Sequence, residues 1–344
     1  MRLNLRRVPT QELMRLDQVA DHLNLKCQPG DEEFVDQAKK AVMRRIRAVA
    51  KDAKPANGEE LIAAIASRFR VRFESVRSES DVEKLHTRYF KRRRELGFAM
   101  LGDDLGDPQV DALLFQLENA VDDDDAEFVA VLNLRQTDLR EYWNKGHELA
   151  HRIAEPPQKI LPFRRHPAER RSPIESLVDE IASEVAFYGP LFKPCVKRFA
   201  KSHDLTLQTV RQIKRVFAPS ASLLSVANAT VKYWPQPAIV LVAEERGRIK
   251  GGRATKIDEA LRVRMHACNQ KAAELNVATF PNMRVPASSP LNFAYFERRE
   301  LQEYENLKYW VTSQGRRLPD IETLTSARGY GDRAYAIVSV QSVE

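Results

Sequence analysis

Hydrophobic and polar positions follow two different periods along this chain, and the change between them predicts a mixed fold. Apolar residues recur every three or four positions over residues 11–25 and 59–69, which is typical of amphipathic helices. Residues 71–76 instead alternate apolar and polar side chains, and residues 127–134 form a compact β-type run. We therefore expect an α+β fold in which helices cover a small sheet.

A helix is expected over residues 138–154, directly after the β-type run at 127–134. Thr137 or Asp138 is its candidate N-cap, and two prolines just beyond its last turn end it. We expect the preceding strand to lie at the edge of the sheet, where an extended peptide could pair with it.

This helix contains the motif His-Glu-x-x-His, at His147, Glu148 and His151. Residues four apart on a helix lie one above the other, so the two histidines point the same way and supply half of a tetrahedral zinc site. Glu148 then lies beside the open position of the metal, where it can take a proton from water and pass it to a leaving amine. The alternative is a buried helix whose histidines are hydrogen-bonded core residues.

The third zinc ligand is expected on a second helix, over residues 172–187. Glu175 and Asp179 share one face of this helix, and that face ends in small residues that permit close packing against the histidine helix. Glu175 can bind zinc, and Asp179, one turn later, can hold the other N–H of a histidine. One alternative stays open: Glu175 could form a capping box with Ser172, and Glu180 would then be the ligand.

Composition places the chain among folded proteins of a reducing compartment. Its 344 residues predict two or three domains, and 43% are hydrophobic, which is typical of globular structure. No apolar run approaches the roughly 20 residues that cross a membrane, and the first residues lack the apolar core of a secretory signal. The three cysteines are widely spaced and odd in number, so we expect a cytoplasmic protein without a disulfide framework.

The net charge of +7 is modest for this length. Its clusters of Lys and Arg are interpreted as solvated helix faces or loops, with a nucleic-acid surface as the alternative. The aspartate run at residues 122–125 is interpreted as a solvated turn, because it lacks the alternating ligands and the glycine of a calcium loop.

Breaks in the pattern divide the chain into four segments. We expect residues 1–57 to form an N-terminal helical segment and residues 58–195, which carry the His-Glu-x-x-His motif, to form a zinc metallopeptidase domain. Residues 196–235 have the pattern of two short helices joined by a tight turn. The second of these carries few base-reading side chains, so a helical linker is favoured over a DNA-binding helix-turn-helix. Residues 236–344 mix both periods and are interpreted as an α/β sensory or regulatory domain.

Further elements are expected inside these segments. Residues 97–107 are assigned to a loop or to strand ends, residues 158–171 to a basic loop, and residues 238–244 and 334–340 to strands. Helices are expected over residues 81–96, 109–121, 257–275 and 300–313.

The two ligand-bearing helices together resemble the ImmA/IrrE family of metallo-endopeptidases. The resemblance rests on Gly-His-Glu-Leu-Ala-His, which ends at His151, and on Glu-Ser-Leu-Val-Asp-Glu-Ile-Ala-Ser-Glu, which begins at Glu175. Position by position, Glu175 takes the ligand place and Asp179 the Asp/Asn place. The closing Leu-x-Pro of the family is altered here to Ala-Phe-Tyr-Gly-Pro, ending at Pro190. The resemblance covers roughly residues 59–195.

This resemblance implies a gluzincin-like, zincin-fold peptidase with Zn²⁺ as its cofactor. Relatives cut helix-turn-helix repressors of the XRE type and so release stress-response or mobile-element genes. Some relatives also carry a helical middle segment followed by a GAF-like sensory domain. It therefore implies a repressor as protein substrate and a GAF-like C-terminal domain with a small-molecule effector.

The expected mechanism is metal-assisted peptide hydrolysis, with zinc held by His147, His151 and Glu175 and with Glu148 as general base and then acid. Candidates for stabilising the oxyanion, by proximity in the sequence alone, are Tyr142, Tyr188 and Arg135. Two other functions stay open. The chain could be a non-catalytic module that binds a repressor or, less favoured, DNA, or it could be a toxin-like peptidase restrained by a partner.

Overall fold

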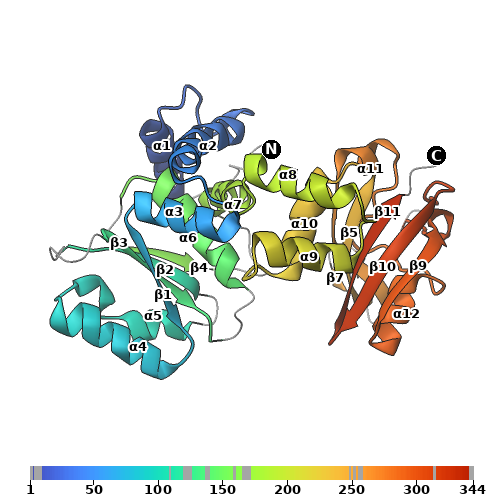
Figure 1. Cartoon of the computed structure of the whole chain (residues 1–344). Coiled ribbons are helices and arrows are strands. Elements are labelled where there is room, and N and C mark those ends of the chain that lie inside the picture. The colour runs from blue at the N-terminus through green and yellow to red at the C-terminus, as the bar shows by residue number, and fades with distance from the viewer. Residues whose placement is uncertain are drawn as a thin grey trace. The chain divides into compact units, whose positions relative to one another are not determined.

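The computed structural model describes Leu3 and residues 10–107, 110–118, 126–135, 140–157, 160–164, 172–247, 249–250, 253–254, 259–312 and 315–340. The chain divides into two compact units, Met1–Phe192 with Ala218–Ser222 and Lys193–Phe217 with Leu223–Glu344. Both units contain helices and strands, so the fold is α+β (Figure 1). The finer division into four segments stays a prediction.

The first unit begins with a pair of helices and continues as a helix-covered sheet. Its elements are α1 (Thr10–Leu23), α2 (Phe34–Ala53), α3 (Gly58–Arg68), β1 (Val71–Val76), α4 (Glu79–Leu85), a π-helix (His86–Arg92), a 3₁₀ turn (Leu96–Phe98), α5 (Leu101–Gly106), β2 (Val110–Gln116), β3 (Phe128–Asn133), α6 (Glu141–Ala154), β4 (Ile160–Arg164) and α7 (Pro173–Ala186). The helix α8 (Gly189–Ala200) crosses into the second unit.

The sheet of the first unit has the order β1-β3-β2-β4, with β1 parallel to β3 and the other pairs antiparallel. Figure 1 shows α3 and α6 on one side of this sheet and α4 and α5 on the other. The prediction that the strand before the histidine helix lies at the edge was wrong, because β3 pairs on both sides. Five of its six residues are buried, as expected for a strand covered on both faces.

Aromatic stacking joins the π-helix and the 3₁₀ turn to the sheet. The ring of Phe98 stacks between Tyr89 and Phe115, with centroid distances of 4.5 and 4.1 Å. Phe115 belongs to β2, so the helix predicted over residues 109–121 was wrong. Its apolar run is short and buried on both faces, and periodicity alone does not separate such a strand from a helix.

Other expectations in this region were partly wrong. The single helix predicted over residues 81–96 is α4 followed by the π-helix, the loop predicted over 97–107 contains α5, and the loop predicted over 158–171 contains β4. The candidate N-cap at residues 137–138 and the aspartate run at 122–125 lie outside the described residues.

Helices α6 and α7 pack at close range through small residues. A Cβ placed on Gly146 of α6 would lie 3.4 Å from the Cβ of Ala186 and 3.7 Å from the carbonyl oxygen of Ala182, both on α7. The buried Tyr142 hydroxyl of α6 donates to the Ala186 carbonyl. This contact brings the two predicted ligand-bearing helices side by side, with the small-residue face of α7 turned toward α6.

The N-terminal pair α1 and α2 is tied to both of these helices. Arg45 of α2 donates from Nη1 to the Ile153 carbonyl at the end of α6 and from Nη2 to the His22 carbonyl of α1, each at 3.0 Å. Lys39 of α2 pairs with Glu180 of α7 at 3.2 Å. The pair therefore belongs to the same unit as the histidine helix.

The second unit is built on an antiparallel sheet with the order β8-β5-β11-β10-β9. Besides most of α8, its elements are α9 (Leu207–Phe217), α10 (Leu223–Tyr233), β5 (Ala238–Arg246), β6 (Ile249–Lys250), β7 (Arg253–Ala254), β8 (Ala260–Cys268), α11 (Gln270–Glu274), α12 (Pro290–Glu297), β9 (Glu300–Asn306), a 3₁₀ turn (Leu307–Tyr309), β10 (Glu322–Tyr330) and β11 (Arg333–Val340). Helix α12 crosses β10 so closely that a Cβ on Gly329 would lie 2.2 Å from the Ala294 carbonyl oxygen.

Two helices predicted for this unit, over residues 257–275 and 300–313, were largely wrong, because residues 260–268 and 300–306 form the strands β8 and β9. Of the described residues in these two ranges, only α11, at residues 270–274, forms an α-helix as predicted. Both strands mix apolar and polar residues in a pattern that also fits an amphipathic helix, and pairing with β5 and β10 overrides that local preference. Within the described residues, each helix is too short or too polar to span a lipid bilayer.

Candidate metal centre

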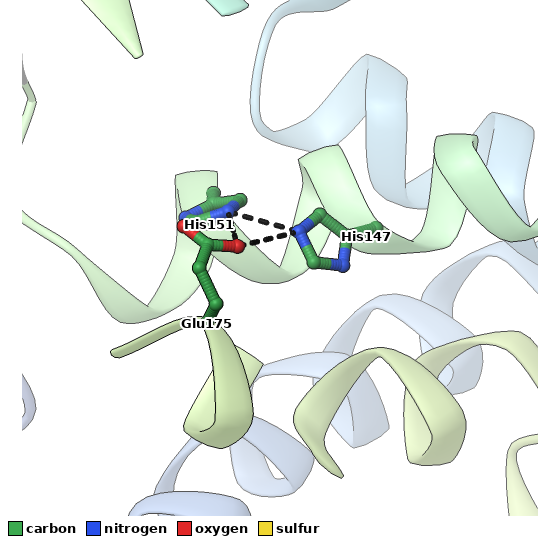
Figure 2. Close-up of side chains that lie close together, drawn as sticks. All are labelled: His147, His151 and Glu175. Carbon is green, nitrogen blue, oxygen red and sulfur yellow. Dashed lines mark hydrogen bonds and ion pairs between the residues drawn. The ribbon is translucent and has the colours of Figure 1, made fainter. Parts of the chain in front are cut away.

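Helix α6 places its two histidines side by side in the interior of the first unit. His147 and His151 have relative exposures of 0% and 2%, and their Nε2 atoms lie 3.0 Å apart. One face of α6 packs on the sheet and another on α7, so the turn that carries the motif has little access to solvent. Figure 2 shows the two imidazoles with Glu175 of α7 beside them.

Glu175, in the first turn of α7, completes a cluster of three donor atoms. Its Oε2 atom lies 3.3 Å from His147 Nε2 and 3.4 Å from His151 Nε2. The capping-box alternative is not formed, since the Ser172 side chain makes no capping hydrogen bond. Glu180, the ligand expected if Glu175 only capped the helix, is paired with Lys39 instead.

The cluster fits a tetrahedral metal ion. Ligands with bonds of about 2.0–2.1 Å to a tetrahedral zinc ion lie about 3.3 Å from one another. The three donor atoms are separated by 3.0 to 3.4 Å, and two imidazole nitrogens with one carboxylate oxygen suit a divalent transition metal. Two imidazole nitrogens and a carboxylate oxygen that converge in the interior need a proton or a cation between them. The residues present therefore form a possible metal site.

Each histidine also contacts a carboxylate through its other ring nitrogen. Asp179 Oδ1 lies 3.2 Å from His147 Nδ1, and Glu155 Oε1 lies 2.5 Å from His151 Nδ1. Carboxylates in this position fix the tautomer and the orientation of metal-bound imidazoles. Sequence reasoning missed Glu155. Its spacing of four residues from His151, on the same helical face, is the signal that could have found it.

Burial and charge act in opposite directions on the ligands. Burial lowers the pKa of His147, but Asp179 and Glu175 outweigh it and the net pKa is raised. Burial also opposes the charged form of His151, yet Glu175 and Glu155 raise its pKa well above the usual value. Conversely, the two histidines hold the pKa of Glu175 below its usual range in spite of burial. The two histidines thus keep the Glu175 carboxylate ionised.

The carboxyl group of Glu148, the residue after His147, has no hydrogen-bond partner in the described part of the chain. Both of its carboxylate oxygens are buried, and its relative exposure is 0%. Burial raises its pKa to about 7, against the opposing charges of His151 and His147. A carboxyl group with a pKa near neutrality can both accept and release a proton, which is what a general base and acid must do.

The side chains named as oxyanion candidates have other partners or surroundings. The Tyr142 hydroxyl is bonded to the Ala186 carbonyl, and Arg135 binds Glu79 and the Leu105 carbonyl. Tyr188 is buried at 5% relative exposure.

No protein-family model matches the chain, and no curated protein matches it. Among solved structures, a similar one is described as a Mycobacterium tuberculosis transcriptional regulator. The two share 11% sequence identity at a TM-score of 0.44, over 96% of this chain and 81% of that chain. A likeness at this level identifies neither a family nor a function.

Proposed function

We propose that this chain is a zinc-dependent endopeptidase that hydrolyses a peptide bond in another protein. One observation carries the proposal. Three donor atoms of His147, His151 and Glu175 converge within 3.4 Å of one another, and the buried carboxyl group of Glu148 is close enough for their charges to act on its pKa. Two histidines, a carboxylate and an adjacent glutamate are the groups that metal-assisted hydrolysis requires.

In this proposal His147 and His151 bind zinc through Nε2, and Glu175 binds it through Oε2. The metal, when bound, supplies a Lewis acid that polarises a carbonyl and makes water a nucleophile near neutral pH. Glu148 takes the proton of the attacking water on a carboxylate oxygen and then gives it to the nitrogen of the leaving amine. Glu155 holds His151 by accepting its Nδ1–H group, and the charge of Asp179 acts on His147 from 3.2 Å away from its Nδ1.

The fold of the first unit supports the same proposal. A helix that carries two metal-binding histidines and packs on a small mixed sheet agrees with the zincin-like fold implied by the resemblance to ImmA/IrrE peptidases. In the described part of the sheet, β4 pairs only with β2, so its other edge offers backbone groups to an extended peptide. We propose this edge, rather than β3, as the place where substrate backbone pairs.

The substrate and its control are proposed from the resemblance. A helix-turn-helix repressor is the protein substrate, and its cleavage switches on a stress or mobile-element response. Counting only the five strands of the second sheet in chain order, their spatial order is 2-1-5-4-3, and the resemblance implies a GAF-like domain at this place. We propose that this unit binds a small-molecule effector and regulates the peptidase.

A search for new protein N-termini in cells of the source organism tests the proposal. Cells with the wild-type chain are compared with cells carrying Glu148→Gln, which keeps the size of the side chain and removes its basicity. A matched control is Glu141→Gln on the same helix, because Glu141 pairs with Arg77 and Lys145 away from the cluster. New termini in a repressor are expected with the wild type and with Glu141→Gln but not with Glu148→Gln. Cleavage that persists in Glu148→Gln would contradict the proposal.

A further inference from the structure

The N-terminal helix α1, to which sequence reasoning assigned no chemistry, reaches the metal centre through one side chain. Arg15 of α1 donates to Glu155 Oε2 from Nη2 at 2.7 Å and from Nε at 3.2 Å. The other oxygen of Glu155 meets His151 Nδ1. Arg15, Glu155 and His151 therefore form a continuous chain of contacts that ends at a ligand atom.

The two oxygens of Glu155 have separate tasks in this chain. Oε2 is occupied by the fork of the Arg15 guanidinium, which leaves Oε1 to accept from His151 Nδ1. An imidazole that donates from Nδ1 presents its Nε2 lone pair to the metal. Glu155 has a relative exposure of only 1%, and a carboxylate buried to this degree stays ionised only with a cation beside it.

The other histidine is held differently. Asp179, which contacts His147, belongs to α7, the helix that also provides Glu175, and its side chain is 25% exposed. This contact supports His147 from within the two ligand-bearing helices. The support of His151 extends further, to a residue of α1 that lies 140 positions from Glu155 in the sequence.

We propose that α1 is part of the metal centre: Arg15 positions Glu155, and Glu155 positions His151 Nε2 toward the metal. Both are positioning residues, since neither contacts the substrate or the metal. The inference rests on the proposed function, because it assumes that His147, His151 and Glu175 bind zinc.

A purely structural role is the competing explanation, in which the Arg15 pair only fastens α1 to α6. Lys39 of α2 offers a control for that role. It joins the N-terminal pair α1 and α2 to α7 through Glu180 and Glu184, and it does not contact a donor residue of the cluster. Arg15 also lines an open cavity of about 810 Å³ together with Met14, Gln18, Asp21, His22, Pro156 and Pro157. Truncation of Arg15 therefore enlarges existing space and leaves no closed void.

The test measures Zn²⁺ affinity of the full chain by competition with a chelator, and the visible spectrum of the Co²⁺-loaded chain. Glu155→Gln is expected to lower Zn²⁺ affinity by about 10- to 100-fold, as loss of an outer carboxylate does elsewhere. Arg15→Ala is expected to lower it by a smaller factor and to change the Co²⁺ spectrum. In the Glu155→Gln background Arg15→Ala should have no further effect, since it acts through Glu155.

Two further variants complete the design. Arg15→Lys keeps the charge but not the fork, so it should restore part of the affinity lost in Arg15→Ala. Lys39→Ala should leave both the affinity and the spectrum unchanged. Glu155→Gln conserves shape, so the proposal stays testable should Arg15→Ala fail to fold.

Wild-type Zn²⁺ affinity in Glu155→Gln, additive effects of the two substitutions, or an equal loss in Lys39→Ala would each overturn the inference and leave the proposed function standing. Absence of Zn²⁺ binding by the wild-type chain would overturn both.

Discussion

Two glutamates in the two units of this chain show how a buried acid in a structural role differs from one available for chemistry. Glu148 in the first unit and Glu305 in the second both have a pKa raised by burial. Glu305 accepts hydrogen bonds from the Trp310 indole at 2.9 Å and from the Thr325 hydroxyl at 2.6 Å. Both oxygens of Glu148 are buried without such a partner in the described residues.

Burial raises the pKa of both glutamates, so the pKa does not distinguish a structural role from a chemical one. The presence or absence of hydrogen-bond partners does. A buried polar group with partners contributes to the fold, whereas one without partners carries a cost that needs a reason. For Glu148 the neighbouring imidazoles and Glu175 provide that reason. We expect Glu305 to act in stability alone.

The largest effect is expected on Zn²⁺ affinity, from replacing a donor of the first-unit cluster, because Glu305 has no such cluster among the described residues. Glu175→Gln should weaken Zn²⁺ binding well beyond the roughly 10- to 100-fold cost of an outer carboxylate, because it replaces a donor to the metal. Glu180→Gln, on the same helix but paired with Lys39, is the control and should bind Zn²⁺ as the wild type does. Isothermal titration or chelator competition measures both. Equal losses in the two variants would contradict the assignment.

A pH-dependent effect on stability should follow from Glu148 in metal-free protein. Its pKa is raised from 4.5 to about 7, so the protonated form stabilises the folded chain below pH 4.5 and that stability is lost as the pH rises through 7. The span corresponds to roughly 3 kcal/mol at most. Glu148→Gln has no such loss, so it should unfold at a higher temperature than the wild type at pH 8 but not at pH 4.5. Thermal unfolding at the two pH values measures this, and an equal difference at both would contradict the account.

A smaller effect of opposite sign is expected from Glu305→Gln. An amide accepts through only one atom, so the variant loses one of the bonds from Trp310 and Thr325 and should be destabilised by about 1 kcal/mol. Zn²⁺ binding should not change. Unfolding curves and metal titration of the same sample check both statements, and a stabilised variant would remove the distinction between the two glutamates.

The sequence predicted the parts of the site that depend on local periodicity. His147 and His151 share a helical face because they are four residues apart, and Glu175 and Asp179 share another for the same reason. Arg15 could not be predicted, since its contact with Glu155 joins residues 140 positions apart and depends on how α1 packs. Glu155 could have been predicted, because it is four residues after His151.

Errors in the fold have a common physical cause. Residues 110–116, 260–268 and 300–306 have side-chain patterns that suit either a helix or a strand, and pairing with distant strands decides between them. The prediction that β3 lies at the edge of the sheet was wrong for the same reason. Its partners β1 and β2 come from other parts of the sequence, so local patterns do not reveal them.

The most direct test of a zinc peptidase is cleavage of a protein extract from the source organism by the purified full chain. The account predicts that the wild type generates specific new N-termini, that a chelator stops this and that one equivalent of Zn²⁺ restores it. It also predicts that Glu148→Gln holds the same amount of zinc and generates none. Cleavage by Glu148→Gln at the wild-type rate, or cleavage that withstands complete removal of the metal, would contradict it.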